Sequence, residues 1–296
     1  MEPVLFGGHV TKALNSLQCD EGIHSCVPLS LPPELKVVKP YQPIWFIGAG
    51  PGDPSLLTLK AAEVLSSAEI VLFDSLVSAE VLQLCNPEAQ LVSVGKRGYG
   101  KSYKQSDINQ MLVDCAFSGS LTVRLKSGDP CIFGRLDEEM EALRLHKLDY
   151  KVVPGITSSL AMAASMQESL TRRDRNSSFS VITGHDLKGF AEHDWLKISE
   201  PGSVTCIYMG LRVVEHLQSR MMQYGASINL PVIIGQNISR KDEVIVKSSL
   251  GELLSDSKTL EGDGPVLIIV GIDMASELSV ANSAINGIDR MIRLSL

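Results

Sequence analysis

From Pro43 onward, short β-rich runs alternate with segments of helical periodicity, and this alternation limits the possible folds more than any other property of the sequence. It predicts a parallel sheet with helices on both faces, because parallel strands need crossover connections. In the segment Leu56–Ser67, for example, Leu57, Ala61 and Leu65 share one helix face. The β-rich runs of the first half are Ile44–Ile47, Ile70–Phe73, Leu91–Val94, Leu121–Leu125 and Tyr150–Val153, and the helical segments are Leu56–Ser67, Ala79–Leu84, Gln105–Phe117 and Asp137–His146.

A second set of elements follows the break at Pro154-Gly155. A chain of 296 residues is long enough for two compact domains. We therefore expect two α/β domains, at residues 42–154 and 155–275, between a poorly ordered extension at 1–41 and a tail at 276–296. The second set comprises helical segments at Ser158–Met166 and Arg212–Tyr224 and β-rich runs at Phe179–Thr183, Val204–Tyr208, Pro231–Gln236, Glu243–Lys247 and Val266–Val270.

Composition excludes several classes of protein. No apolar run approaches the ~20 residues that a membrane-spanning helix needs, so no membrane partner is expected. The net charge of -7 and the pI of about 5.4 disfavour a nucleic-acid partner. The six cysteines form no C-x-x-C pair and the six histidines show no ligand spacing, so no metal site is expected. The N-terminus shows no secretory signal, which favours the cytoplasm, or a plastid if the extension is a targeting segment.

A glycine-rich turn, Gly48-Ala49-Gly50-Pro51-Gly52-Asp53, follows the first β-rich run. Such a turn is typical of a nucleotide site, where backbone N–H groups approach a ligand closely. The dinucleotide fingerprint G-x-G-x-x-G is incomplete here, because its third glycine is replaced by Asp53, whose charge repels a pyrophosphate. Pro51 also lacks an N–H. These residues favour a ligand without phosphates. Asp74, at the end of the second β-rich run, could nevertheless serve as a ribose-binding acid, so a nicotinamide-dependent dehydrogenase stays open as an alternative.

Five motifs in order carry a resemblance to a known family. They are GAGPGDPSLLTLKA (Gly48–Ala61), VRLKSGDPCIFGR (Val123–Arg135), VPGITSS (Val153–Ser159), LTRRDR (Leu170–Arg175) and TGH (Thr183–His185). Together they resemble the uroporphyrinogen-methylating members of the tetrapyrrole methylase family, over roughly Pro43 to Gly271. The resemblance implies the class III methyltransferase fold, with two α/β domains and an active site in the cleft between them.

The resemblance also implies an activity. Members of this kind transfer methyl groups from S-adenosylmethionine to C2 and C7 of uroporphyrinogen III, leaving S-adenosylhomocysteine and giving precorrin-2 for sirohaem or cobalamin. They use no metal and form homodimers. The alternatives are a related methylase acting on a corrin intermediate, a protein or ribosomal RNA, the nicotinamide-dependent dehydrogenase, and a non-catalytic relative that binds and senses S-adenosylmethionine.

Matching the family's positions assigns a set of residues to the methyl donor. S-adenosylmethionine presents an adenine, a ribose, an amino-acid end and a sulfonium, which hydroxyls, backbone groups and soft apolar side chains can hold. Asp129 is suited to pair with a ribose hydroxyl or the ammonium group. With the glycines of the first turn, the expected donor-binding residues are Gly50, Pro51, Gly52, Ser127, Gly128, Asp129, Ile132, Thr157, Ser158, Met209 and Ile238.

The resemblance further marks Asp74 as proton acceptor, Lys96 as proton donor and Arg135 as a catalytic residue, with Glu138 and Arg173 on the substrate side. A carboxylate in a dry site can have a raised pKa, which makes Asp74 the preferred base. The pKa of arginine lies above ~12, so carboxylate binding suits Arg135 better. Taken singly, Asp74 is equally consistent with a turn cap, and Lys96 and Glu138 with solvated surface charges.

Basic residues gather near these motifs although the chain is acidic. The groups are residues 95–104, then Arg172, Arg173 and Arg175, then Arg124, Lys126 and Arg135. If they converge, they form a basic site that attracts and orients a substrate with many carboxylates.

The chain departs from the family pattern at several positions. Ser127 replaces a glycine, Ser75 an arginine and Arg172 a histidine, and Leu136-Asp137 replaces a glycine pair. Ile238-Ser239 replaces a glycine-threonine pair, which is expected to affect how the adenine is seated, because isoleucine tolerates fewer backbone conformations than glycine.

Overall fold

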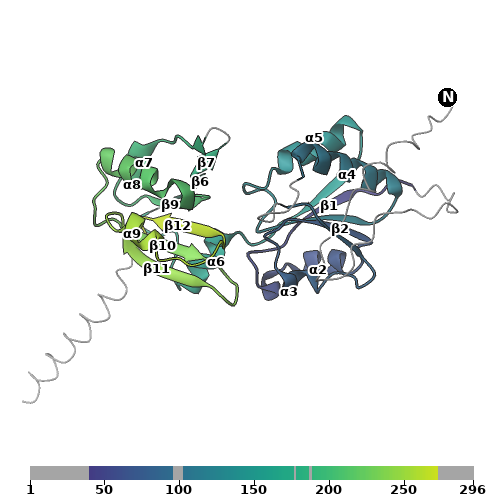
Figure 1. Ribbon diagram of the computed structural model, residues 1–296, viewed down its shortest axis with the longest axis horizontal. Coiled ribbons are helices and arrows are strands. Elements are labelled where there is room, and N and C mark those ends of the chain that lie inside the picture. The colour runs from purple at the N-terminus through teal and green to yellow at the C-terminus, as the bar shows by residue number, and fades with distance from the viewer. Residues whose placement is uncertain (1–39, 96–102, 177, 187–188, 273–296) are drawn as a thin grey trace, which may run out of the picture. The chain divides into compact units, whose positions relative to one another are not determined.

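The computed structural model describes residues 40–95, 103–176, 178–186 and 189–272 (Figure 1). It divides into two compact units, Met1–Ser158 and Ser159–Leu296, here called the first and second unit. The expected tail, and the expected extension up to residue 39, lie outside the described residues. Within the described part, no helix has the length and apolar character needed to cross a bilayer.

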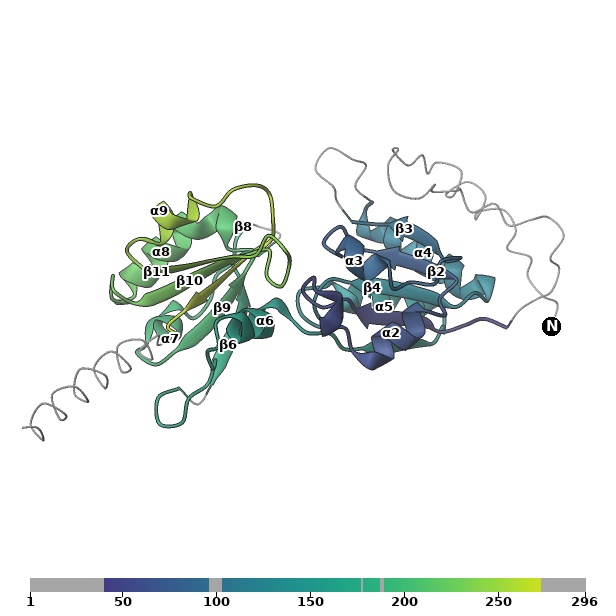
Figure 2. The same ribbon diagram turned by 90° about the horizontal axis from the view of Figure 1, so that it is seen from below.

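The first unit is a five-stranded parallel sheet in the order β3-β2-β4-β1-β5. Helices cover both of its faces, α4 and α5 on one and α2 and α3 on the other (Figures 1 and 2). Its elements are β1 (Ile44–Gly48), the 3₁₀ helix η1 (Pro54–Leu56), α2 (Leu59–Leu65), β2 (Ile70–Phe73), α3 (Ala79–Leu82), β3 (Gln90–Ser93), α4 (Gln105–Ser118), β4 (Thr122–Lys126), α5 (Leu136–Leu145) and β5 (Tyr150–Val153).

Two apolar layers hold this sheet between its helices. Phe46 and Leu72 belong to the layer beneath α4 and α5, with Leu112 and Leu143. Ile47 and Val71, their neighbours along the strands, belong to the layer beneath α2 and α3. Both faces of the sheet are therefore buried, which is why β2 is apolar along its whole length.

The second unit is a five-stranded mixed sheet in the order β11-β10-β12-β9-β6, beside a two-stranded hairpin, β7-β8. Only the β6–β9 pair of the larger sheet is parallel. Its elements are α6 (Ser158–Ser165), β6 (Phe179–Thr183), β7 (His185–Asp186), β8 (Gly189–Phe190), α7 (Trp195–Ser199), β9 (Val204–Tyr208), η2 (Leu211–Val213), α8 (Val214–Gln223), β10 (Pro231–Gln236), β11 (Val244–Ser249), α9 (Leu253–Ser257) and β12 (Val266–Val270).

One apolar cluster unites this second sheet with α7, α8 and α9. Trp195, Leu217 and Leu253 come from these three helices and pack with Ile234 and Ile268 of the sheet. Elsewhere in the unit α6 lies against β10, because a Cβ added to Gly235 would stand 2.7 Å from the Met162 sulfur. This contact of Met162 packs the middle of α6 against the sheet.

All ten predicted β-rich runs are strands, most with the predicted limits. The predicted helix Leu56–Ser67 is instead η1 followed by α2, because Thr58 caps a new helix with its hydroxyl. The sequence patterns missed α7, α9 and the β7-β8 hairpin, and they did not indicate that the second sheet is mostly antiparallel.

Candidate functional site

Four candidate segments of the first unit lie at one edge of its sheet. The glycine turn follows β1, Asp74 follows β2, Ser127-Gly128-Asp129 follows β4, and Gly155 to Thr157 follows β5. These strands are parallel, so their carboxyl ends meet at the same edge. Ligands of open α/β sheets bind at this edge, which makes it the candidate site of this unit.

The two glycine-containing turns are joined directly. Gly50 N–H donates to Gly128 O at 3.2 Å, and Gly128 N–H donates to Gly50 O at 2.8 Å. The Asp129 carboxylate holds the same region, because its Oδ1 accepts from Cys131 N–H at 2.8 Å and its Oδ2 from Gly155 N–H at 2.9 Å. Asp129 therefore has a structural role here.

Backbone packing at this edge requires glycine. A Cβ on Gly48 would lie 2.5 Å from Gly155 N, and a Cβ on Gly155 would lie 2.2 Å from Gly128 O. Three turns thus meet backbone to backbone, a contact that the sequence analysis did not anticipate for Gly48 or Gly155.

We expect Gly155→Ala to destabilise the protein by at least about 1–3 kcal/mol, because the new methyl group meets backbone atoms that cannot move aside cheaply. Urea unfolding of the full chain measures this loss. Gly251→Ala is the matched control, since its Cβ would come no closer than 3.3 Å to Ile228 O. Equal unfolding free energies for the two variants would contradict the close packing described above.

The first turn does not have the features of a pyrophosphate site. Asp53 uses its carboxylate to cap η1, accepting from Ser55 N–H at 2.8 Å. Pro51 and Gly52 are buried, and Gly52 O accepts from the Ser78 hydroxyl at 2.7 Å. In addition, β4 separates β1 from β2, whereas these strands are neighbours in a dinucleotide-binding sheet. The dehydrogenase alternative therefore loses its structural basis.

Asp74 takes part in a network of four charged side chains. Arg124 Nη2 lies 2.5 Å from Asp74 Oδ1 and 3.1 Å from Glu139 Oε1, and Lys126 Nζ lies 2.9 Å from Glu139 Oε2. Arg124, Lys126 and Glu139 are no more than 2% exposed, whereas the Asp74 side chain is 29% exposed. Asp74 is thus the member of the network that reaches the surface, and Arg124 fixes its orientation.

This network corrects two expectations. Arg124 and Lys126 do not contribute to a basic substrate-facing surface, because they are buried and neutralised by Asp74 and Glu139. Asp74 is not an isolated carboxylate in apolar surroundings, because a guanidinium contacts it. Burial lowers the pKa of Arg124, but the charges of Asp74 and Glu139 outweigh it, so the pKa is raised overall. Burial and then the Arg124 charge lower the pKa of Lys126, while Glu139 opposes them.

Arg135 and Glu138 form an exposed pair at the start of α5. Arg135 Nε and Nη2 donate to the two oxygens of Glu138 at 2.7 and 2.8 Å. Hydrogen bonding to Glu138 raises the pKa of Arg135 above its ordinary value, despite an opposing effect of burial. Arg135 is therefore a stable cation, suited to binding carboxylates and not to accepting protons.

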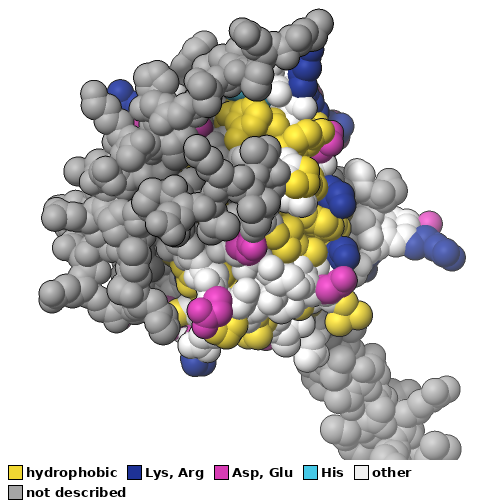
Figure 3. Space-filling view, turned by 90° about the vertical axis from the view of Figure 1, so that its right-hand side faces the viewer, with side chains coloured by type: hydrophobic (Ala, Val, Ile, Leu, Met, Phe, Trp, Pro, Cys, Tyr) yellow, Lys and Arg dark blue, Asp and Glu magenta, His cyan; other side chains and the backbone are white. Residues whose placement is uncertain are grey.

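The other expected substrate residues are less constrained. Arg173 is exposed, in a turn closed by the Arg172–Asn176 bridge. Lys96 lies outside the described residues, although the preceding Gly95 packs on Ser75, where a Cβ would stand 2.1 Å from Ser75 N. Figure 3 views the side of the molecule at the right of Figure 1, and its described surface mixes both charge signs with apolar side chains. That part of the surface is not uniformly basic.

Two of the expected donor-binding residues, Met209 and Ile238, lie in the second unit. Met209 follows β9, is 51% exposed and has a φ of 53°, a left-handed conformation that methionine rarely adopts. Ile238 is only 5% exposed, and its Cδ1 would lie 2.6 Å from a Cβ on Gly235. The Ile238 side chain is therefore packed inside the unit.

Left-handed backbone conformations at non-glycine residues concentrate in the candidate motifs. Arg135 and Met209 have φ values of 53°, and the two neighbours of Ile238, Asn237 and Ser239, have values of 54° and 60°. Ile238 itself does not have positive φ, so isoleucine is not strained where the family has glycine. Strain of this kind persists where surrounding structure enforces it, commonly at binding sites. The full set is Phe133, Arg135, Lys147, Gln167, Asp174, Met209, Asn237 and Ser239.

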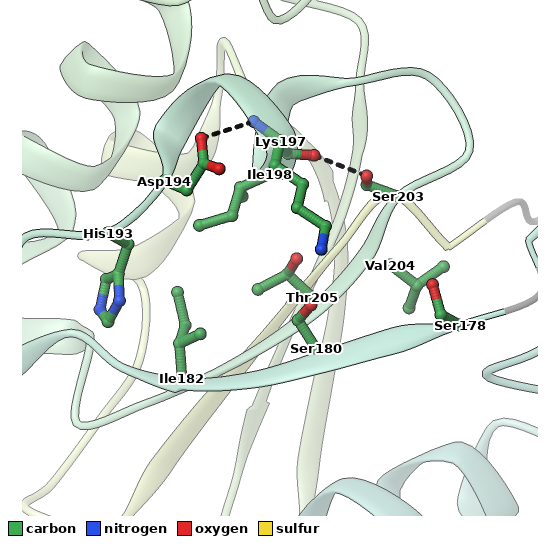
Figure 4. A pocket seen from close by; sticks show the side chains of 10 residues that line it. All are labelled: Ser178, Ser180, Ile182, His193, Asp194, Lys197, Ile198, Ser203, Val204 and Thr205. Carbon is green, nitrogen blue, oxygen red and sulfur yellow. Dashed lines mark hydrogen bonds between the residues drawn. The ribbon is translucent and has the colours of Figure 1, made fainter.

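A separate small cavity of about 150 Å³ lies at the other end of β6 and β9, away from Met209 (Figure 4). Lys197 and Thr205 are among the side chains around it, with Ser180, His193 and Asp194. It is smaller than the ~300–1,000 Å³ typical of ligand pockets, so it does not suit S-adenosylmethionine. Among the described residues, no group of three or more His, Cys, Asp or Glu side chains is arranged to hold a metal.

Among the four cysteines that the structure describes, Cys131 is the exposed one, and we expect it to react in preference to the other three. Burial and then the Asp129 charge raise the pKa of Cys131 above its ordinary value, so iodoacetamide labelling should be slow at neutral pH and should accelerate as the pH is raised. Burial raises the pKa of Cys85 to about 11 and those of Cys115 and Cys206 to about 12. Peptide mapping by mass spectrometry should find these three unlabelled in the folded protein; equal labelling would contradict the assigned burial.

Comparison with known proteins supplies the family. The model of the tetrapyrrole (corrin/porphyrin) methylases matches residues 43–254, which include both turns of the first unit, Asp74 and Met209. The chain belongs to the tetrapyrrole methylase family. Its fold is the class III methyltransferase fold expected from the motifs.

Individual relatives agree with this assignment. The chain is 40% identical over 233 residues to a sirohaem synthase of Pseudoalteromonas translucida, covering 79% of this chain and 49% of the relative. It is 36% identical over 230 residues to a uroporphyrinogen-III C-methyltransferase of Bacillus subtilis, covering 77% and 48%. The chain thus spans about half the length of the curated relatives it matches. A solved uroporphyrin-III C-methyltransferase of Thermus thermophilus, complexed with S-adenosylhomocysteine, is 33% identical with a TM-score of 0.67, over 78% of this chain and 97% of that one.

Proposed function

We propose that this chain is a methyltransferase that transfers methyl groups from S-adenosylmethionine to C2 and C7 of uroporphyrinogen III, giving precorrin-2. The observation that carries the proposal is the similarity to the Thermus enzyme, which extends over 97% of that structure at 33% identity. The further length of the sirohaem synthases has no counterpart in the match, so the proposal covers methyl transfer alone. It includes a homodimer, which rests on the resemblance.

The first-unit edge fits a donor that has no phosphate. Gly128 lies beside Thr157, since a Cβ on Gly128 would lie 3.9 Å from the Thr157 Cα. Backbone groups at this edge and the hydroxyls of Ser127, Thr157 and Ser158 are the kinds of group that hydrogen-bond the polar parts of such a donor. When bound, S-adenosylmethionine supplies an electrophilic methyl group on its sulfonium.

The pyrrole carbon is the nucleophile in this reaction, so the protein mainly orients the reactants and removes a proton after transfer. We assign proton removal to Asp74, which Arg124 holds at the carboxyl end of β2. Arg135 binds a substrate carboxylate, and its bond to Glu138 orients the guanidinium in advance. Arg173 is the second carboxylate-binding candidate, and Lys96 remains the expected proton donor.

The decisive experiment incubates the full chain with uroporphyrinogen III and S-adenosylmethionine labelled in its methyl group. We expect two labelled methyl groups in the tetrapyrrole product by mass spectrometry, and inhibition by added S-adenosylhomocysteine. A folded chain that binds S-adenosylhomocysteine but leaves uroporphyrinogen III unlabelled would overturn the proposed substrate. Label on a corrin intermediate, a protein or ribosomal RNA would then identify the related methylase instead.

A further inference from the structure

Tyr208, the last residue of β9, connects three segments of the second unit. Its backbone O accepts from Gly184 N–H at 2.7 Å, and its side-chain hydroxyl accepts from Ser159 N–H at 3.0 Å. Gly184 belongs to the Thr183–His185 motif, Ser159 lies in the first turn of α6, and Met209 follows Tyr208 in the chain. No role has been assigned above to the Tyr208 side chain.

The position of this hydroxyl is set by the sheet. Tyr208 pairs with Leu267 of β12 on one side and with Thr183 of β6 on the other. Its backbone is therefore held from both sides, and the phenol extends from a fixed point. The hydroxyl gives a defined anchor to any group that bonds to it.

The start of α6 needs such an anchor. The first N–H groups of a helix have no partner within the helix, and Ser159 N–H is one of them. Ser159 is fully buried, and its own hydroxyl has no hydrogen-bond partner in the described structure. The bond from Ser159 N–H to Tyr208 thus satisfies a donor that water cannot reach and fixes the residue next to Ser158.

The turn after Tyr208 is equally constrained. A Cβ on Gly184 would lie 2.7 Å from Gly210 Cα, so the TGH motif packs directly against the turn that contains Met209. Met209 keeps its left-handed conformation within this packing. Through these two hydrogen bonds, Tyr208 is therefore joined both to the TGH motif, which packs against the Met209 turn, and to the first turn of α6.

We propose that the Tyr208 hydroxyl is a positioning group for the methyl donor, which holds the first turn of α6 in register with the Met209 turn. The inference rests on the proposed function, since it takes Ser158 and Met209 to contact S-adenosylmethionine. Tyr208 does not touch the reacting atoms in this account. It acts through the backbone segments on either side of it.

Tyr208→Phe tests the inference, because it removes the hydroxyl and keeps the ring. We expect the Kd for S-adenosylhomocysteine, measured by calorimetry, to rise about three- to tenfold, as loss of one hydrogen bond implies. KM for S-adenosylmethionine should rise similarly, while KM for uroporphyrinogen III stays within about twofold. Hydrogen exchange at the Ser159 amide should accelerate in the same variant. Tyr224→Phe is the control, because Tyr224 is an exposed tyrosine of the same unit.

The outcomes separate this inference from the proposed function. Faster Ser159 exchange with an unchanged Kd would overturn the positioning role, since the bond would then serve folding alone. Unchanged exchange at Ser159 would overturn the bond itself. A wild-type chain that does not bind S-adenosylhomocysteine would overturn the proposed function instead, whatever the variant does.

Discussion

Replacing Asp74 with asparagine should reduce methylation of uroporphyrinogen III by about 10²–10⁴-fold, the range expected for loss of a general base. The amide keeps an oxygen that can accept from Arg124, so the side chain should stay near its present position. The affinity for S-adenosylhomocysteine should remain within about twofold. Single-turnover assays with labelled donor, together with calorimetry, measure the two effects separately.

Asp149→Asn is the matched control for this prediction. Asp149 is an exposed aspartate just before β5, at the opposite edge of the same sheet, where Tyr41 donates to it at 3.5 Å. Its replacement should leave turnover unchanged. If Asp74→Asn also turned over at the wild-type rate, Asp74 would have no part in the chemistry, and another group would have to accept the proton.

The strands of this protein were predictable because their composition reflects their surroundings. All four residues of β2 (Ile70–Phe73) are buried, and an apolar run of this length between turn residues is typical of a parallel strand. The helices α7 and α9 have only five residues each, too few for a helical period to show. Strand direction in the second unit depends on which strands pair, and no local pattern encodes that.

The location of the candidate site could be predicted from the sequence, but the buried ion pairs beneath it could not. Its motifs follow strands, so the carboxyl edge of the sheet was expected to gather them. The chain Thr122–Lys126 alternates apolar residues with Arg124 and Lys126, a pattern typical of a strand with one exposed face. Because β4 lies between β2 and β1 under α4 and α5, that face is buried, and the carboxylates of Asp74 and of Glu139, from α5, balance its two cations.

The same network gives the largest expected effect on stability. Removing the carboxylate with Glu139→Gln should cost about 3–5 kcal/mol in the free energy of unfolding, because Lys126 would keep a buried charge without its partner. Urea unfolding monitored by circular dichroism measures the loss. The exposed pair Lys60–Glu63, at 3.0 Å, is the control, and Glu63→Gln should cost less than about 1 kcal/mol.

A double variant distinguishes lost charge balance from lost packing. In Glu139→Gln with Lys126→Met, one buried positive and one buried negative charge are removed together, and Arg124 keeps Asp74. We expect the double variant to recover more than half of the stability that the single variant loses. If the losses of unfolding free energy in the two single variants simply added in the double variant, lost packing and not lost charge balance would explain them.

The pH dependence of Glu139→Gln gives an independent check on Lys126. Burial and the Arg124 charge already lower the pKa of Lys126 in the folded protein, and Glu139 opposes both effects. Without Glu139 the folded-state pKa falls further, while the unfolded-state value stays near ~10.4. Between these two values the unfolded chain binds more protons, so the free energy of unfolding rises with pH. The rise should therefore begin at a lower pH in the variant than in the wild type, and coincident profiles would show that Lys126 does not carry the buried charge.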